Sequence, residues 1–351
     1  PGSVVGHFRS GTLTRCFSTA SVEYGKGDCG GLIGKIGKPA VISNCGFAGN
    51  LTCGWSAGLL SGSTDGNDPD VTISDILLDA RNVTYENGDG HGLLVGWFHD
   101  GVGQKTSNIW VIEGPSLTDI VGYKHEEAAV LAVTHKISES DAATGVATFG
   151  LNKGNITSPV WFQTLDVDDS PTLDPTHGVV YMISEGQYTN DMAEFRKNVV
   201  TAGKEYAENV IAYKGDIEAY EAALDAFAAL DAFDADVYNA MMDARAAVET
   251  SAAAYKQYTD RLAEIEAYVN EHSDEFFGSS YETLLSYIEE DVEPCEEFPN
   301  GSAAYITENK ALTGEQIVAE VAFMNALLEA AIKANYQKGT EITNLMTNAD
   351  L

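Results

Sequence analysis

Four short segments in the first 123 residues repeat one pattern of glycine and apolar residues. They are Ser3-Val4-Val5-Gly6, Gly31-Leu32-Ile33-Gly34, Gly58-Leu59-Leu60-Ser61-Gly62 and Gly92-Leu93-Leu94-Val95-Gly96. Their leading apolar residues are 28, 27 and 34 residues apart, a period typical of stacked supersecondary units. The pattern therefore predicts a one-dimensional fold of stacked coils.

Each repeat carries a second apolar segment further along the chain, so two short strands per coil are expected. These segments are Leu13 to Val22, Val41 to Leu51, Val71 to Val83 and Ser107 to Leu117. When they are aligned, one slot is always filled by a small or branched apolar side chain, namely Cys16, Cys45, Ile76 and Ile109. This slot predicts a ladder of side chains facing one interior, with the abundant glycines making the tight turns between strands.

The third and fourth repeats contain inserted residues, near 65–70 and 99–103. Insertions in a repeat fold map to loops on its outer rim. We expect any specificity for a ligand to lie in these two loops.

The repeated segments resemble the GLUG motif of bacterial cell-surface proteins, which is named for its Gly-Leu-apolar-Gly core. Residues 31–34 fit the motif strictly, whereas the third and fourth segments have one extra residue before the closing glycine. The stretch from 151 to 178 looks like the segment that follows such repeats in Bacteroidetes surface proteins, and together the two regions cover about residues 1–181. The resemblance implies a β-solenoid displayed outside the cell, as in accessory regions of large secreted proteins that include some immunoglobulin-cleaving metalloproteases. It implies no catalysis by the repeats.

The composition changes near residue 185, where glycine becomes rare and Ala, Glu, Asp, Leu and Tyr dominate. We predict a multidomain chain, β then α: solenoid repeats over 1–123, final coils or a cap of the solenoid over 124–184, and an acidic helical bundle over 185–351. The helical part matches no family known to us.

Apolar residues at steps of three and four predict the helices of this bundle. From Met192 to Phe227 they indicate one long helix, or two with a break near Gly215. The next helix carries a coiled-coil-like seam, because Met241, Val248, Tyr255, Leu262 and Val269 recur every seven residues. A shorter helix is expected over 280–291, and a last one begins at Thr313 with Gln316 completing a capping box. Segment 292–312 reads as a long connection, and the helices are expected to pack as an antiparallel bundle.

The chain of 351 residues has a formal net charge of −33. Acidic residues outnumber basic ones by 20 to 10 before residue 185 and by 33 to 10 after it, so the helical part is the more acidic. A net-negative surface without a basic stripe disfavours nucleic acid as a partner. No apolar run is long enough to span a membrane, and Pro1 begins in the middle of a coil, so we expect a fragment of a longer protein with its export signal upstream and any membrane anchor outside this chain.

Five cysteines are an odd number, and their positions argue against a disulfide framework. Cys16 and Cys45 occupy one interior slot in adjacent coils, where they are either buried apolar thiols or a bridged pair. Cys53 and Cys295 have no evident partner. No Cys-x-x-Cys pair offers a zinc site.

Motifs for chemistry are nearly absent. His125-Glu126-Glu127 begins like a zinc-protease helix but lacks the second histidine. Segment 166–170 begins like a calcium loop, yet Pro171 replaces the turn glycine and His177 the bidentate glutamate. The cluster of Asp65, Asp68 and Asp70 could also gather oxygen ligands. We expect no cofactor, with Ca²⁺ at one of these loops as the alternative to a solvated turn.

Exposed aromatic side chains are the remaining signal for a ligand. The candidate ligand-binding residues are Trp55, Trp97, Phe98, His99 and Asp100, which lie in or near the third and fourth repeats. Aromatic rings stack on sugars, but Trp97 and Trp110 are also spaced like core residues.

Three functional classes follow from this fold prediction, which is an argument by analogy. The first is a surface-exposed binding or adhesion protein that presents its loops to a host or environmental glycan or protein ligand, with the helices as a spacer. The second is a structural stalk without a ligand. The third is a carbohydrate-active enzyme on a β-helix, which generally needs more coils and a groove of Asp, Lys and Arg. The expected location is extracellular or on the outer-membrane surface of a bacterium.

Overall fold

A computed structural model describes residues 1–64, 70–85, 90–98, 105–115, 119–123 and 127–337. The chain divides into two compact units, Pro1–Phe195 and Arg196–Leu351. The first unit contains the parallel β-strands and the second is helical. The two are described separately below.

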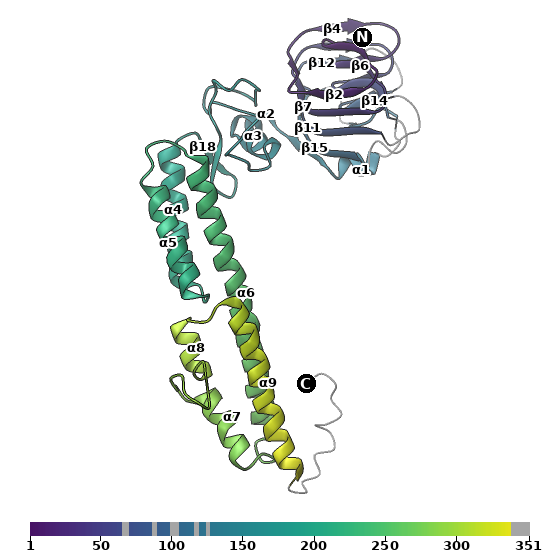
Figure 1. The fold of residues 1–351 in the computed structure, drawn as a ribbon. Coiled ribbons are helices and arrows are strands. Elements are labelled where there is room, and N and C mark those ends of the chain that lie inside the picture. Colours follow the sequence, from purple (N-terminus) through teal and green to yellow (C-terminus); the bar gives the residue numbers. More distant parts are fainter. Residues whose placement is uncertain (65–69, 86–89, 99–104, 116–118, 124–126, 338–351) are drawn as a thin grey trace. The chain divides into compact units, whose positions relative to one another are not determined.

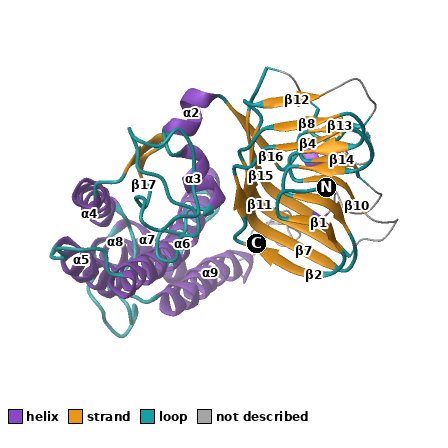
Figure 2. Ribbon diagram, turned by 90° about the horizontal axis from the view of Figure 1, so that it is seen from above, coloured by secondary structure: helices purple, strands orange, loops and turns teal. Residues whose placement is uncertain are grey.

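The first unit is a parallel β-solenoid of about four coils, which confirms the fold predicted from the repeats (Figure 2). Sheet A consists of β1 (Val5–Phe8), β6 (Ile33–Ile36), β10 (Ser61–Thr64) and β14 (Val95–Trp97). Sheet B consists of β2 (Gly11–Thr14), β7 (Ala40–Phe47), β11 (Val71–Asp79), β15 (Thr106–Ile112) and β16 (Thr134–Ile137), with β3 (Phe17–Ser18) also paired to β7. Every strand pair in these two sheets is parallel and lies in register between successive coils.

Two narrower sheets complete each coil, so the expectation of two strands per coil was wrong. Sheet C stacks β4 (Val22–Tyr24), β8 (Leu51–Cys53) and β12 (Val83–Tyr85). Sheet D stacks β5 (Cys29–Gly30), β9 (Ala57–Gly58) and β13 (His91–Gly92). The second apolar segment of a repeat therefore turns a corner and supplies strands to both sheet B and sheet C.

We name the coils by residues: first, 1–28; second, 29–56; third, 57–90; fourth, 91–123.

The leading apolar residues of the last three repeats fill the interior, as predicted, whereas Val4 of the first repeat is 45% exposed. Leu32, Leu59 and Leu93 are fully buried or nearly so. The slot of Cys45, Ile76 and Ile109 is aligned by the pairing of sheet B and is also buried. In each coil a left-handed residue precedes this slot, with φ between 50° and 57°: Arg15, Asn44, Asp75 and Asn108. The same local kink recurs on every coil, and it keeps the following side chain in the interior row.

Residues 127–195 include short elements that follow the fourth coil. They are α1 (Glu127–Leu131), α2 (Glu139–Ala143), α3 (Val146–Leu151), β17 (Tyr181–Ser184) and β18 (Gln187–Thr189). Strand β16 extends sheet B. Helices α2 and α3 and the segment after them pack on the outer face of sheet B, where Trp161 of that segment joins Leu77 of β11 and Trp110 of β15 in one buried cluster. This region covers the outside of sheet B rather than adding complete coils.

The helices predicted from periodicity are present (Figure 1). They are α4 (Met192–Asn209), α5 (Lys214–Ala228), α6 (Ala235–Glu271), α7 (Ser279–Glu289), α8 (Ala303–Asn309) and α9 (Gly314–Gln337). The break between α4 and α5 lies just before Gly215, and Thr313 with Gln316 forms the capping box through reciprocal hydrogen bonds. Helix α8 was not predicted and lies within the expected connection.

Helix α6 is shared by two groups of helices. Its first half lies antiparallel to α5, because Tyr238 packs on Phe227 near the end of α5, while Arg245, further along α6, lies close to Tyr220, which is earlier in α5. Its second half runs parallel to α9, since Tyr255 bonds to Leu312 and Arg261 to Asn325 further along both helices. The heptad residues Met241, Val248, Tyr255 and Val269 are buried, as are Tyr258 and Ile265. Among the described helices, none combines the length and apolarity needed to cross a membrane.

Candidate functional site

One row of side chains crosses the outer side of sheet A from coil to coil. The parallel register aligns His7 with Lys35, Lys35 with Ser63, and Ser63 with Trp97. A further bridge between Val95 and Val121 places Tyr123 in the same row, two residues on. We call His7, Lys35, Ser63, Trp97 and Tyr123 the sheet A row. Because parallel strands in register keep one side of the sheet, the row runs along that side from coil to coil, with Ser63 buried within it.

Trp97 and Tyr123 form an exposed aromatic stack at one end of the sheet A row. Their ring centroids are 4.2 Å apart with an interplanar angle of 28°. Trp97 is 36% exposed and Tyr123 is 38% exposed, so both rings remain accessible to solvent. Gly90 has a positive φ of 88°, and a β-carbon there would lie only 3.2 Å from the tyrosine ring. A glycine at this turn therefore allows Tyr123 to lie against the backbone.

Ser63 lies in the middle of the sheet A row, between Lys35 and Trp97. Its hydroxyl oxygen is buried and has no hydrogen-bond partner among the residues that the structure describes. A buried hydroxyl without a partner costs free energy, since it has given up its hydrogen bonds to water. The serine thus adds a polar group of unused hydrogen-bonding capacity beside the aromatic stack.

The structure separates the five ligand-binding residues predicted from sequence. Trp97 lies in the sheet A row, but Trp55 is on the connection between β8 and β9, where it is 60% exposed and no described ring stacks on it. Phe98 is fully buried and belongs to the core of the solenoid, so its place among the ligand residues is corrected here. His99 and Asp100 lie outside the described residues. Tyr123, which completes the stack, is not among the five candidates named from the sequence.

The first unit contains a disulfide that was not predicted from the sequence. Cys29 and Cys53 are bonded, with their α-carbons 6.4 Å apart, and both belong to the second coil. The expectation that Cys53 has no partner was therefore wrong. Cys16, Cys45 and Cys295 are free thiols.

The loop from Asp166, considered as the alternative calcium site, is organised by internal hydrogen bonds. A carboxylate oxygen of Asp168 lies 2.6 Å from Nδ1 of His177 and also accepts the backbone N–H of Thr164. Of the other candidate loop, Asp65 and Asp68 lie outside the described residues, and Asp70 is 3.8 Å from the Lys105 ammonium. Within the described ranges no group of three or more His, Cys, Asp or Glu side chains could hold a metal ion. His125 and Glu126 also lie outside these ranges.

Two buried carboxylates of the solenoid are held by cations and serve the packing of the cap. Asp75 accepts hydrogen bonds from Asn108 and from Lys153, which follows α3. Asp79 binds the guanidinium of Arg81, which also reaches Glu139 of α2, and the bond to Asp79 raises the pKa of the arginine. With their charges compensated in this way, neither carboxylate is placed as a free general acid or base.

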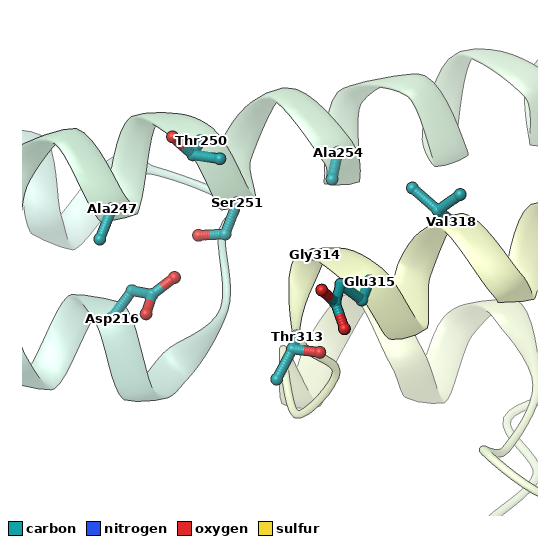
Figure 3. Close-up of a pocket in the computed structure, with 9 residues that line it drawn as sticks. All are labelled: Asp216, Ala247, Thr250, Ser251, Ala254, Thr313, Gly314, Glu315 and Val318. Carbon is teal, nitrogen blue, oxygen red and sulfur yellow. The ribbon is translucent and has the colours of Figure 1, made fainter.

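The helical unit contains a groove of about 660 Å³ where the starts of α5 and α9 approach the middle of α6 (Figure 3). Asp216 and Glu315 supply carboxylates on its walls, and Ala254 and Val318 supply apolar surface. The hydroxyl of Ser251 accepts the backbone N–H of Tyr213 and donates to the carbonyl of Val248. Both hydrogen bonds engage this hydroxyl with the backbone, so Ser251 is not placed as an activated nucleophile.

The comparisons with known proteins assign no relative to this chain. No protein-family model, no curated protein and no solved structure matches it. The likeness to the GLUG motif therefore remains a resemblance of short residue patterns.

Proposed function

We propose that this protein is a binding protein that recognises a glycan through the sheet A row. The observation that carries the proposal is the stack of Trp97 on Tyr123, which is exposed on a rigid parallel sheet. Aromatic rings combine a large apolar surface with a polar tip, and they are enriched where proteins meet ligands. A pair of rings fixed by backbone register forms a preorganised surface, which lowers the entropic cost of binding.

The spacing of the row suits an extended polymer. Successive rungs of a parallel sheet are about 4.8 Å apart, so the four steps from Tyr123 to His7 span about 19 Å. One sugar ring of an extended polysaccharide has about the length of one rung. A glycan lying along the row would contact the stack with one unit and the ammonium of Lys35 and the imidazole of His7 with others.

The disulfide supports a location outside the cytoplasm. Bonds such as Cys29–Cys53 persist in oxidising compartments and are rare where thiols are kept reduced. Together with the resemblance to the GLUG motif, this supports display on a bacterial surface. Helix α6 has 37 residues and is about 55 Å long, which suits a spacer.

The second candidate function is a structural stalk without a ligand. The length of α6 supports a stalk as well as it supports a spacer within a binding protein. Unlike a binding protein, a stalk gives the exposed Trp97 no role. A carbohydrate-active enzyme receives no support from the buried carboxylates Asp75 and Asp79, which are both bound to cations.

The proposal is tested by screening the full chain on a glycan array and titrating the best glycan by intrinsic tryptophan fluorescence. We expect Trp97→Ala to weaken binding by roughly tenfold or more, which corresponds to about 1.4 kcal/mol. Trp55→Ala is the matched control, since it removes an indole that is more exposed but lies away from the sheet A row. Circular dichroism confirms that both variants fold. Absence of binding to every glycan, or equal affinity of Trp97→Ala and the parent protein, would overturn the proposal and leave the stalk.

A further inference from the structure

Two free thiols face each other across the first and second coils. The parallel pairing of Thr14 with Ser43 and of Phe17 with Gly46 brackets Cys16 and Cys45, so the two cysteines occupy equivalent positions in adjacent coils. Neighbouring positions of this kind are about 4.8 Å apart, within the range that a disulfide spans. The residue before each cysteine has the same left-handed conformation. The two side chains therefore leave the backbone in the same direction.

The two thiols differ in their access to solvent. Cys45 is fully buried, and its thiol contacts the carbonyls of Ser43 and Leu13 as well as the thiol of Cys16. Cys16 is only half-buried, because it lies between β2 and β3 at the edge of sheet B, where no described strand covers it. A reagent that approaches this end of the solenoid meets Cys16 first.

We propose that Cys16 and Cys45 are a site of disulfide formation, at which a disulfide-bearing oxidant joins the first coil to the second. The thiolate of Cys16 attacks one sulfur of the oxidant, forms a mixed disulfide and releases the other sulfur as a thiolate. Cys45 then loses its proton and attacks the Cys16 sulfur, which releases the second thiolate of the oxidant. Two thiols of the protein are oxidised to one disulfide, and one disulfide of the oxidant is reduced to two thiols.

The order of the two steps follows from the surroundings of the thiols. Burial raises the pKa of Cys45 to about 12, so its thiolate is scarce at neutral pH and it is a poor first nucleophile. Within the mixed disulfide, however, the target sulfur is held beside Cys45, and proximity compensates for the low thiolate fraction. Cys45 is therefore the resolving thiol.

A Cys16–Cys45 disulfide would lie at the end of the solenoid where the interior residues are least buried. Phe8, Leu13 and Cys16 of the first coil are only partly buried, whereas the residues aligned with them in the second coil, Ile36, Ile42 and Cys45, are fully buried. The Cys29–Cys53 bond already closes the second coil on itself. A Cys16–Cys45 bond would fasten the first coil to that closed coil.

The experiment uses the full chain with Cys295→Ser, which removes the exposed thiol outside this pair. The protein is incubated with oxidised glutathione and analysed by intact mass and by mapping of disulfide-linked peptides. We expect a loss of two hydrogen atoms, no retained glutathione, and a peptide that joins Cys16 to Cys45. Adding Cys45→Ser should leave a stable glutathione adduct on Cys16, whereas adding Cys16→Ser should leave Cys45 unmodified while the protein is folded.

Three results would overturn the proposal. They are two thiols that still react with an alkylating reagent after the treated protein is denatured, a persistent glutathione adduct on the Cys295→Ser protein, and a peptide that joins either cysteine to Cys29 or Cys53. The Cys295→Ser protein decides the matter by itself, so a folding defect in either second variant does not affect the conclusion. The test does not depend on whether a glycan binds.

Discussion

A β-carbon built on Gly62 would lie 2.3 Å from the backbone nitrogen of Cys29. Sheets A and D meet at this corner so closely that the closing glycine of one coil touches the backbone of the coil before it. Gly96 has the same relationship with the nitrogen of Ala57, also at 2.3 Å. Gly6 occupies the same row in the first coil, but nothing lies within 4 Å of its β-carbon position.

This difference predicts unequal effects of one substitution at equivalent positions. Gly62→Ala forces a β-carbon against backbone atoms, so we expect it to destabilise the solenoid by more than about 4 kcal/mol or to prevent folding. Gly6→Ala should change the free energy of unfolding by less than about 0.5 kcal/mol. Urea unfolding followed by circular dichroism measures both. A Gly62→Ala protein as stable as Gly6→Ala would show that the corner is looser than described.

The closing glycine also explains which parts of the fold could be predicted. The recurrence of Gly-Leu-apolar-Gly reports the tight corner directly, so the solenoid and its interior rows follow from spacing alone. Phe98 lies one residue beyond Trp97, and its burial depends on the strand register there. That register aligns Phe98 with Thr64 and Ile36, whose side chains are buried, and it therefore points to the core.

The Cys29–Cys53 disulfide could not be predicted from the alignment of the repeats. Aligning repeats shows which residues are neighbours in adjacent coils, whereas these two cysteines belong to one coil and to different sheets. Their approach depends on where the chain turns between β5 and β8. The exposed Trp97–Tyr123 stack was missed as a pair because the bridge that aligns Tyr123 lies outside the repeated segment.

The packing of residues 139–178 on sheet B gives a second prediction. Trp161 is fully buried and its ring lies edge-on to Phe17, with centroids 6.2 Å apart. Trp161→Ala removes the largest side chain of this contact and leaves a cavity, so we expect a loss of about 3–5 kcal/mol in the stability of the first unit. Trp55→Ala, at an exposed position, should cost less than about 0.5 kcal/mol. Chemical denaturation of the full chain compares the two variants, and equal stabilities would mean that the cap contributes little.

A buried carboxylate in the helical unit gives a third prediction. Glu320 is 3% exposed and accepts hydrogen bonds from the hydroxyl of Tyr287 at 2.9 Å and from Nδ2 of Asn300 at 2.7 Å. The hydroxyl of Tyr258 lies 2.8 Å from that of Tyr287 and extends the network. Each donor compensates the carboxylate for lost hydration, because hydrogen bonds to a charged group are worth more than neutral ones.

Tyr287→Phe removes one of these donors with little change of shape. We expect it to lower the free energy of unfolding of the helical unit by about 1.5–3 kcal/mol, since the buried carboxylate is left with less compensation. Ser286→Ala is the control, because Ser286 donates to the exposed Glu290 on the same helix and should contribute less than about 0.5 kcal/mol. Thermal and urea unfolding at pH 7 measure the difference. A Tyr287→Phe protein as stable as the parent would mean that the network adds nothing to stability.

The buried thiol of Cys45 predicts a loss of stability at alkaline pH. Burial raises the pKa of this thiol from 9.0 to about 12 in the folded protein, so folding favours the neutral form. The resulting stabilisation is fully present below about pH 9 and is lost as the pH rises towards about 12, by at most about 1.4 kcal/mol per pH unit. Cys45→Ala has no such group, so it removes this pH-dependent contribution and leaves every tyrosine in place.

The measurement is the difference in free energy of unfolding between the parent protein and Cys45→Ala, taken between pH 8 and pH 11. Both proteins carry Cys295→Ser, and intact mass confirms that the Cys16 and Cys45 thiols of the parent are free. We expect any advantage of the parent at pH 8 to shrink and then reverse as the pH rises, because unfolding releases the thiol to ionise. Oxidation of the pair should abolish this dependence, since a disulfide does not titrate. A difference that stays constant across the range in the reduced pair would contradict the burial of the Cys45 thiol.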